Sequence, residues 1–546
     1  MHSKLKIIHL LIFFSIGLNL KAQVENVNIY HPVYDYLLRM ETKGLLPNFS
    51  LSDIPLQRYE ISDALRNIQI KESILSESEK SVLKSFLGEF EITPGASTVV
   101  FYSKSDSNQI FFDGLFSSRD KFIYRYADSS NAFNLLPLVS FEYILRNYQS
   151  KTENAMLGNL GFRLYGTIDN TLGYYLQVTN GVRIAGEKSV ALEDSRLRYN
   201  VKFADLNSDF DFAESHINYK NKWFFLSIGR ENRKLGAGIS NRLILSDNAP
   251  PHDQLSAGVK FRSFSYKYTH HSLLGVHETR SEFGPDAVIP SKYAATHRFA
   301  IRPEWGEIAF WEHVIYSGRY PDLAYLNPLS FFKSLEHSLH DRDNSLMGLD
   351  ATFRFLDNIQ FKGTFLLDDI IFSEIGNGYW ANKTAVSAGL IISFIDNLDI
   401  SMEYTRVEPY TYSHFRYQNS FTNDSLLYGS YLQPNSDEFA ILMQYWPGFR
   451  YPVKVRFSYR QHGANVYSGD GKLLKNVGSD PFIARRTEDS YFVTFLDGKK
   501  YYITSLELEA GYEIIRNFNL QLKYIAQSVN GELKHLARFV LRFEDF

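Results

Sequence analysis

The sequence contains no cysteine among its 546 residues. This absence excludes disulfide bonds, thiolate metal sites, cysteine nucleophiles and a lipid attached to an N-terminal cysteine. Glycine and proline are also scarce, at 33 and 17 residues, while hydrophobic residues make up 44% of the chain. Disordered, collagen-like and low-complexity classes are therefore excluded, and the chain is expected to fold.

The sequence also lacks a large excess of charge of either sign. With 58 basic and 61 acidic residues, the formal net charge is -3. Such a chain has no broad positive field, so no nucleic-acid partner is expected, although a local basic patch is able to meet an anionic polymer. Aromatic residues make up 15% of the sequence, which favours strands and membrane interfaces over an all-helical protein.

Long hydrophobic runs are absent beyond the N-terminus. There, two lysines precede a mostly apolar run from Ile7 to Leu20, and Ala22 is a suitable cleavage site, so residues 1–22 are predicted to be a signal peptide. The run has about 14 residues, whereas a helix needs about 20 to span a bilayer. A membrane location of the mature chain then requires closed β-structure, in which every backbone polar group is paired.

Residues 23–95 show the apolar period of short helices. Pro32 stands at the first turn of one helix, Pro55 opens a second, and Ser76 with Glu79 forms a capping box before a third. Three short helices share only a small core, which gains stability by packing against something larger. We expect a periplasmic helical cap or plug.

From residue 110 to residue 546 the period changes to two, which predicts strands. In one hairpin, residues 162–168 alternate apolar and polar side chains, Asp169 and Asn170 turn the chain, and the alternation resumes. A soluble sandwich also alternates in this way. Short turns on one side, long polar connections such as 230–255 on the other, and the terminal aromatic Phe546 favour an outer-membrane barrel.

Strand number follows from length. At about 10 residues of strand and slightly more of connection per unit, residues 110–546 predict about 18 strands. The predicted fold class is therefore an all-β membrane protein, an antiparallel outer-membrane β-barrel with a small N-terminal helical bundle on its periplasmic side. A barrel of this size holds a water-filled lumen unless loops or a plug close it.

Catalytic and metal sites find little support in the sequence. Glu336, His337, His340, Asp341 and Asp343 form a cluster that is able to hold a metal, but the ligands lack a defined spacing, so a solvated loop is the simpler interpretation. Carboxylates such as Asp368 and Asp369 suggest glycoside hydrolysis, which depends on a paired separation that sequence does not show. No catalytic residue, metal or cofactor is predicted.

A sugar-binding site uses aromatic side chains for the apolar face of the sugar ring, and amides, carboxylates and arginines for its hydroxyl or uronate groups. The chain is rich in all of these residues. Residues 229–238 combine three cations with three glycines, and Asn241 and Arg242 follow closely. An ordinary charged loop, or arginines that brace the barrel wall, is the alternative. This segment is predicted to contact an acidic polysaccharide.

Several short segments, taken in order, resemble the Wzi family of capsule assembly proteins, in a form typical of a Bacteroidota-like bacterium. The resemblance covers most of the mature chain. The segments are residues 32–44, 55–61, 228–238, 243–250, 326–328, 343–350, 367–369 and 433–438.

The resemblance implies an outer-membrane lectin, without enzymatic activity, that attaches or organises capsular or extracellular polysaccharide at the cell surface. Outer-membrane lipid and the barrel assembly machinery are further expected partners, and the expected location is the cell outer membrane. An open diffusion channel for oligosaccharides, a porin, is the alternative. The predicted polysaccharide-binding residues are Arg230, Arg233, Asn241, Arg242, Asp247, Asn327, Asp343, Asp368 and Asp369.

Overall fold

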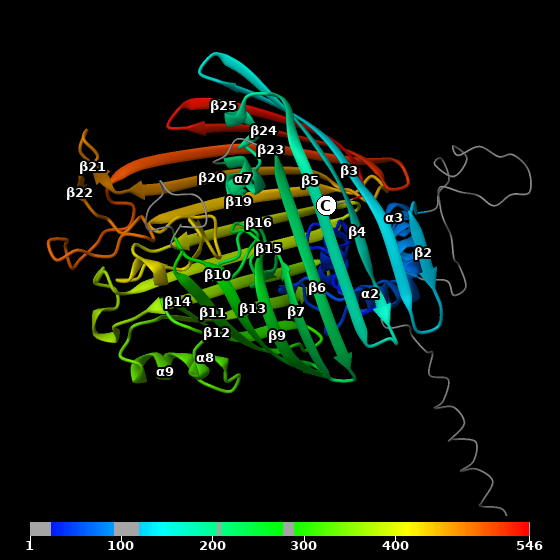
Figure 1. The fold of residues 1–546 in the computed structure, drawn as a ribbon, viewed down its shortest axis with the longest axis horizontal. Coiled ribbons are helices and arrows are strands. Elements are labelled where there is room, and N and C mark those ends of the chain that lie inside the picture. Colours follow the sequence, from blue (N-terminus) through cyan, green and yellow to red (C-terminus); the bar gives the residue numbers. More distant parts are fainter. Residues whose placement is uncertain (1–22, 92–119, 205–208, 277–288, 545–546) are drawn as a thin grey trace, which may run out of the picture.

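The computed structural model describes residues 23–91, 120–204, 209–276 and 289–544. The expected signal peptide, residues 1–22, lies outside the described residues, as does Phe546. Within the described part, a helical bundle precedes a closed antiparallel β-barrel (Figure 1). No helix in these four ranges is long and apolar enough to cross a membrane.

The barrel consists of 18 antiparallel strands in the described residues, and β25 pairs with β3 to close it, so the predicted fold class is confirmed. A short strand, β2 (Tyr124–Ala127), adds to the edge of β3. The barrel strands are β3 (Ala132–Tyr148), β4 (Lys151–Ile168), β5 (Leu172–Gly186), β6 (Phe210–Asn221), β7 (Phe224–Glu231), β9 (His252–Phe261), β10 (Phe264–Leu274), β11 (Ser291–Ile301), β12 (Gly306–Ser317), β13 (Asn344–Leu356), β14 (Ile359–Asp369), β15 (Lys383–Ile395), β16 (Leu398–Val407), β19 (Ser436–Tyr445), β20 (Val453–Ala464), β23 (Lys499–Ile515), β24 (Phe518–Val529) and β25 (Glu532–Phe543).

Alternation along each strand separates an apolar outer face from a polar inner face. On β23, Leu508 points outward, whereas Glu507 points inward to Arg456 at 3.0 Å and to Lys523 at 3.1 Å. The tight hairpin from β4 to β5 turns at Asp169 and Asn170, both with positive φ, as the sequence predicts. The outer face thus has the apolar character that lipid requires.

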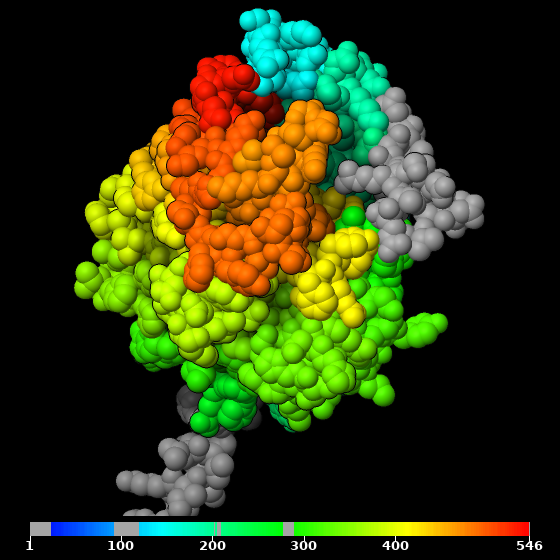
Figure 2. Space-filling model, turned by 90° about the vertical axis from the view of Figure 1, so that its left-hand side faces the viewer, coloured from blue at the N-terminus to red at the C-terminus, as the bar shows by residue number. Residues whose placement is uncertain are grey.

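The two ends of the barrel differ. Short turns such as 222–223, 396–397 and 516–517 join strands at the end where the helical bundle lies, on the right of Figure 1. The longer connections lie at the opposite end. Figure 2 views that end, which the connection 465–498 (orange) partly covers; it contains β21 (Val466–Tyr467) and β22 (Leu473–Lys475).

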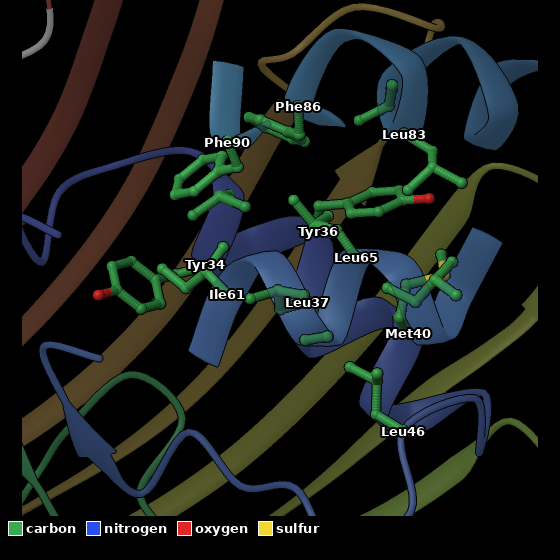
Figure 3. Close-up of a cluster of buried hydrophobic side chains, with 14 of the residues drawn as sticks. Tyr34, Tyr36, Leu37, Met40, Leu46, Ile61, Leu65, Leu83, Phe86 and Phe90 are labelled. Carbon is green, nitrogen blue, oxygen red and sulfur yellow. The ribbon is translucent and has the colours of Figure 1, made fainter. Parts of the chain in front are cut away.

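The bundle consists of α1 (Val33–Thr42), α2 (Arg58–Ile70) and α3 (Glu77–Phe90). The capping box at Ser76 is present. The second helix begins at Arg58 rather than at Pro55, because β1 (Asp53–Ile54) pairs with β8 (Lys234–Leu235) and keeps the chain extended there. Figure 3 shows the small core of this bundle; its residues include Tyr36, Leu37, Met40, Ile61, Leu65, Leu83, Phe86 and Phe90.

The bundle lies inside the end of the barrel and contacts its inner wall. Trp446, which follows β19, belongs to the bundle core. Arg39 of α1 donates to Glu79 at 2.8 Å and also to Asp399 on the inner face of β16. The side-chain amide of Gln360 donates to Glu41 at 3.0 Å. These buried polar contacts join the helices to the barrel wall.

Three connections from the long-loop end fold into the lumen. The first contains α5 (Lys188–Ala191), α6 (Ser195–Arg198) and α7 (Val201–Ala204), which pack against inward side chains of β3, β4 and β6. The second is 232–251. The third is 408–435, with β17 (Thr422–Asn423) and β18 (Leu426–Leu427). The last two form one apolar core with the inner faces of β10–β16; its members include Leu243, Ile244, Trp311, Ile315, Tyr412, Phe421 and Tyr428.

One connection folds the other way. Between β12 and β13, the helices α8 (Leu323–Leu326) and α9 (Phe332–Ser338) lie on the outside of the barrel, below β12 in Figure 1. They bury outward side chains of β10, β11 and β12, among them Tyr268, Ala295 and Val314.

Candidate functional site

Two cavities meet at Tyr30 and Arg196, beside the chain that leads into α1. The side cavity has a volume of about 470 Å³ and is lined by parts of β5, β6 and β7 and by the α6–α7 connection. The lumen cavity has a volume of about 460 Å³ and is lined mainly by β3, β20 and β23–β25. Both share Tyr30 and Arg196, so these residues separate the two spaces.

The side cavity lies where the barrel wall is incomplete in the described residues. The pairing of β6 with β7 ends at Ser215 and Arg230, although β6 itself continues back to Phe210. No described strand pairs with this edge of residues 210–214, and the α6–α7 connection lies beside it. The cavity is therefore at the long-loop end of the barrel, at a notch in its wall.

The side cavity offers aromatic, amide and cationic groups. Tyr199 and Phe212 supply aromatic faces, and the guanidinium of Arg196 lies 5.6 Å from the ring centre of Phe212. The side-chain amide of Asn232 donates to the Tyr30 hydroxyl at 3.4 Å. Aromatic faces with flanking amides and arginines suit the apolar and hydroxyl faces of a sugar ring.

The lumen cavity is lined by charges of both signs, most of them paired. Arg538 donates to Asp194 at 2.8 Å and to Glu142 at 2.7 Å. Lys454 lies 2.7 Å from Asp35. Because the charges largely cancel within the cavity lining, this cavity is polar and wettable rather than a strong trap for one kind of ion.

The protonation states of Tyr30, Tyr199 and Asp194, which line these cavities, follow from their surroundings. Burial raises the pKa of Tyr30, with Asp247 adding to the effect, and burial also raises the pKa of Tyr199. Both hydroxyls therefore stay protonated and able to donate. Burial raises the pKa of the Asp194 carboxyl, but Arg196 and Arg538 outweigh it and hold that pKa below its usual range. Asp194 is thus an ionised acceptor.

Two of the residues predicted from sequence line these cavities. Arg230 lines the side cavity, where it pairs with the exposed Asp253 at 3.3 Å. Asp247 lines the lumen cavity and pairs with Lys234 at 3.1 Å. Their role in polysaccharide binding stays a prediction.

Three other predicted residues hold the connection 232–251 inside the barrel. Arg233 is buried and pairs with Asp53 at 3.1 Å, beside a third cavity of about 440 Å³ between the bundle and the wall. Arg242 donates to the carbonyl of Leu51 at 3.0 Å. The backbone N–H of Asn241 donates to Glu403 at 3.0 Å.

The remaining four lie elsewhere. Asn327 and Asp343 belong to the external connection: the side chain of Asn327 accepts the N–H of Leu329 at 3.1 Å, and Asp343 accepts Arg319 and the Tyr325 hydroxyl. Asp368 accepts the N–H of Tyr412 at 2.6 Å, and Asp369 accepts that of Ile370 at 3.0 Å. The structure does not bring the nine predicted residues together in one site.

Sequence reasoning missed Tyr30, Arg196 and Tyr199. Arg196 and Tyr199 lie in the long polar connection between β5 and β6, which has the same kind of composition as the segment chosen from sequence. Tyr30 lies more than 150 positions earlier. A signal for Arg196 and Tyr199 was present in that connection, but only the fold shows that Tyr30 meets them.

Part of the cluster considered as a metal site in the sequence is assembled in the structure. Ligand atoms of Glu336, His337 and Asp341 lie within 4.8 Å of one another, the one such group in the described ranges. Glu336 already accepts Lys333 at 2.9 Å and the Ser345 hydroxyl. Two donors thus hold the buried carboxylate of this group.

A closed antiparallel barrel of 18 strands with an apolar outer face and a polar interior defines an outer-membrane β-barrel protein. A family model described as capsule assembly protein Wzi matches residues 147–528, which is more than half of the chain. The chain therefore belongs to the Wzi family of capsule assembly proteins, and the predicted family is confirmed.

One solved structure agrees with this fold. Wzi of Escherichia coli, described as an outer membrane protein involved in group 1 capsule assembly and as a carbohydrate-binding β-barrel, is 13% identical with a TM-score of 0.57. The match covers 96% of this chain and 99% of that one. OprD of Pseudomonas aeruginosa is 11% identical with a TM-score of 0.43, covering 76% of this chain and 94% of that one. A search of the curated proteins finds no match.

Proposed function

We propose that this protein is a lectin-like component of the outer membrane that binds capsular or other surface polysaccharide and holds or organises it at the cell surface. Membership of the capsule assembly family supports this role. The Escherichia coli member with the same fold is described as carbohydrate-binding. The cavities at Tyr30 and Arg196 are the observation on which the proposed site depends.

The proposed orientation places residues 23–91 toward the periplasm and the long connections outside the cell. Short turns face the periplasm and longer loops face outward in bacterial outer-membrane barrels, and the bundle lies at the short-turn end. In this orientation the notch beside β6 faces the outer half of the membrane or the cell surface. Insertion by the barrel assembly machinery into outer-membrane lipid belongs to the same proposal.

The proposed recognition is a sugar ring against Tyr199, with hydroxyl or carboxylate groups of the glycan meeting Arg230 and the amides beside it. Among the described residues Arg230 is paired only with an exposed aspartate, an interaction that solvent and salt weaken, so its guanidinium is available for exchange. A guanidinium binds a uronate carboxylate through two parallel hydrogen bonds. An acidic polysaccharide is therefore the preferred ligand class.

The test is the binding of purified acidic capsule to the purified full chain and to Tyr199→Ala and Arg230→Gln. We expect about tenfold weaker binding by each variant, with the Arg230 effect shrinking at high salt. The exposed Lys472→Gln, in the connection 465–498, is the matched control. Unchanged binding by both variants at unchanged thermal stability contradicts this site.

The same preparation distinguishes a lectin from a porin. The bundle and the inward connections occupy the lumen, so the intact protein is expected to give no steady conductance in a planar bilayer. A stable open-channel current contradicts the closed lectin. Polysaccharide incubated with the protein is expected to keep its chain length, and shortened chains would instead indicate hydrolysis.

A further inference from the structure

Residues 319–342, called the external strap here, lie flat against the outside of the barrel (Figure 1). The Tyr268 hydroxyl on β10 donates to the carbonyl of Tyr325 at 2.6 Å, and the Tyr266 hydroxyl donates to that of Pro328. Glu312 on β12 accepts the N–H of Phe332 at 3.2 Å. The strap is therefore bound to three outward side chains on β10 and β12 and is part of the folded wall.

The strap covers polar groups that point away from the lumen. His297 and Glu312 alternate with inward residues such as Arg298, which pairs with Glu307 and Asp350 inside the barrel. His297 contacts Glu312 at 2.6 Å, and the ring of Phe332 stacks on His297 at 4.3 Å between centres. Only 3% of His297 remains exposed.

These covered groups lie at the height of the membrane. His297 is four residues from Ile301, where β11 ends at the short-turn end. A tilted strand rises about 2.5 Å per residue along the barrel axis, so His297 lies about 10 Å into an apolar band about 25 Å tall. The pairing of β10 with β9 agrees with this height. His270 on β10 lies opposite Leu255 on β9, and Leu255 is half exposed on the lipid side. Without the strap, an imidazole and a carboxylate would face hydrocarbon, which is unfavourable.

The other side of the strap is apolar where it faces outward. Leu323 is 82% exposed and Leu329 is 84% exposed, and Phe331 is half exposed. Such side chains in one short segment mark an interaction surface rather than a face toward water. This surface continues the exposed apolar band of the neighbouring strands, represented by Leu255 on β9 and Leu349 on β13.

The polarity of the strap changes along the barrel axis. The exposed residues of α9 are polar: Ser334, His337 and Ser338. In Figure 1, α9 lies farther than α8 from the end that holds the helical bundle. The apolar part of the strap is thus on the membrane side and the polar part on the long-loop side, which is the arrangement of a segment at a membrane interface.

We propose that the external strap is a membrane anchor that lies within the bilayer against the barrel wall, with Leu323, Leu329 and Phe331 among lipid acyl chains. It replaces lipid over the polar patch of His297 and Glu312 and fixes the depth of this side of the barrel. Its irregular backbone is compatible with this position, because the N–H of Leu329 and the carbonyl of Pro328 are both hydrogen-bonded within the protein. The inference does not depend on polysaccharide binding.

The absence of cysteine makes the test direct, since one introduced cysteine is the only thiol in the chain. Leu329→Cys and Leu323→Cys, each carrying an environment-sensitive fluorophore, are reconstituted as full-length protein in phosphatidylcholine vesicles with or without brominated acyl chains. Leu508→Cys on the lipid face of β23 is the positive control, and Lys472→Cys in the connection 465–498 is the aqueous control. Heat-modifiable mobility verifies that each labelled barrel is folded.

For both strap positions we expect blue-shifted emission, quenching by brominated lipid of at least half that at Leu508, and little quenching by aqueous iodide. Emission and iodide quenching like those at Lys472 would overturn the proposal, since the strap would then lie in water. Blue-shifted emission without bromine quenching would also overturn it, because protein, such as a second copy of the chain, would then cover the leucines.

Discussion

The carboxylate of Glu403, on the inner face of β16, accepts the backbone N–H of Asn241 at 3.0 Å. The same carboxylate accepts the N–H of Ser240 at 3.2 Å and that of Ile239. One buried acid therefore holds three consecutive amides of the connection 232–251 inside the lumen. This connection closes the barrel interior because the wall supplies the acceptors that its backbone lacks.

The first prediction concerns this attachment. Glu403→Ala leaves three amides, one buried and two part-buried, without this acceptor, so we expect a loss of about 3 kcal/mol in stability and faster proteolysis within 232–251. Thermal unfolding and limited proteolysis measure these effects. Glu532→Ala, at the exposed β24–β25 hairpin, is the control and should change neither. Wild-type proteolysis of Glu403→Ala would show that the apolar core alone holds the connection.

A second prediction concerns the seat of the helical bundle. Glu89 of α3 contacts His31 at 3.0 Å and Arg516 at 3.5 Å, and it also accepts Arg450 of the β19–β20 turn. Glu89→Gln removes the carboxylate that these cations share, although Arg516 keeps Asp120 and Glu513, and should cost about 3 kcal/mol. Glu77→Gln, whose exposed carboxylate pairs with Lys80, should leave the melting temperature unchanged. Equal melting temperatures for the two variants would contradict this role.

A third prediction is that the stability contributed by the Glu89 carboxylate depends on pH. Burial raises the pKa of Glu89, but Arg450, His31 and Arg58 outweigh it and hold that pKa well below its usual range. A depressed pKa in the folded state means that the stabilisation is complete above the unfolded-state pKa, near 4.3, and is lost as the pH falls toward the folded-state value. The stability difference between wild type and Glu89→Gln should therefore be constant from about pH 7 to 5 and shrink below about 4. Shrinkage already near pH 6 would contradict it.

The lipid face gives a fourth prediction. Leu508 points outward on β23, whereas Gln521 on β24 lines the lumen cavity. Leu508→Arg should impair assembly by about 2–4 kcal/mol, because it places a charge against hydrocarbon, while Gln521→Glu should assemble normally. Heat-modifiable mobility and vesicle insertion measure assembly. Equal assembly of the two variants would contradict the inside and outside assignment.

Local signals account for the parts of the fold that sequence predicted well. The capping pair Ser76 and Glu79 and the turn residues Asp169 and Asn170 act within a few positions of themselves. The alternation at Glu507 and Leu508 also follows from the geometry of a single strand. Each of these could be predicted because its partners are nearby in sequence or follow from the strand period.

The path of the long connections was not predictable in the same way. A polar loop that enters a polar lumen has the same composition as a loop in water, so 232–251 looked like an external segment. Arg233, Asn241 and Arg242 are polar, and the structure shows that inner-wall groups and the bundle satisfy them. The candidate site was not predictable for a similar reason, since Tyr30, Arg196 and Arg230 come from three separate segments that only the fold brings together.

The sequence by itself determined the export-type N-terminal pattern, the helical start, the number of strands and which side of most strands meets lipid. These properties depend on composition and on periods of two or 3.6 residues, which are local. Only the tertiary structure decided which connections fill the lumen, which one lies against the outer wall, and where Tyr30 meets Arg196. Those outcomes depend on buried hydrogen bonds and apolar contacts between residues of different elements, which lie 20 positions apart for Phe332 with Glu312 and 162 positions apart for Asn241 with Glu403. No local pattern specifies such a pair, because either partner alone is compatible with water.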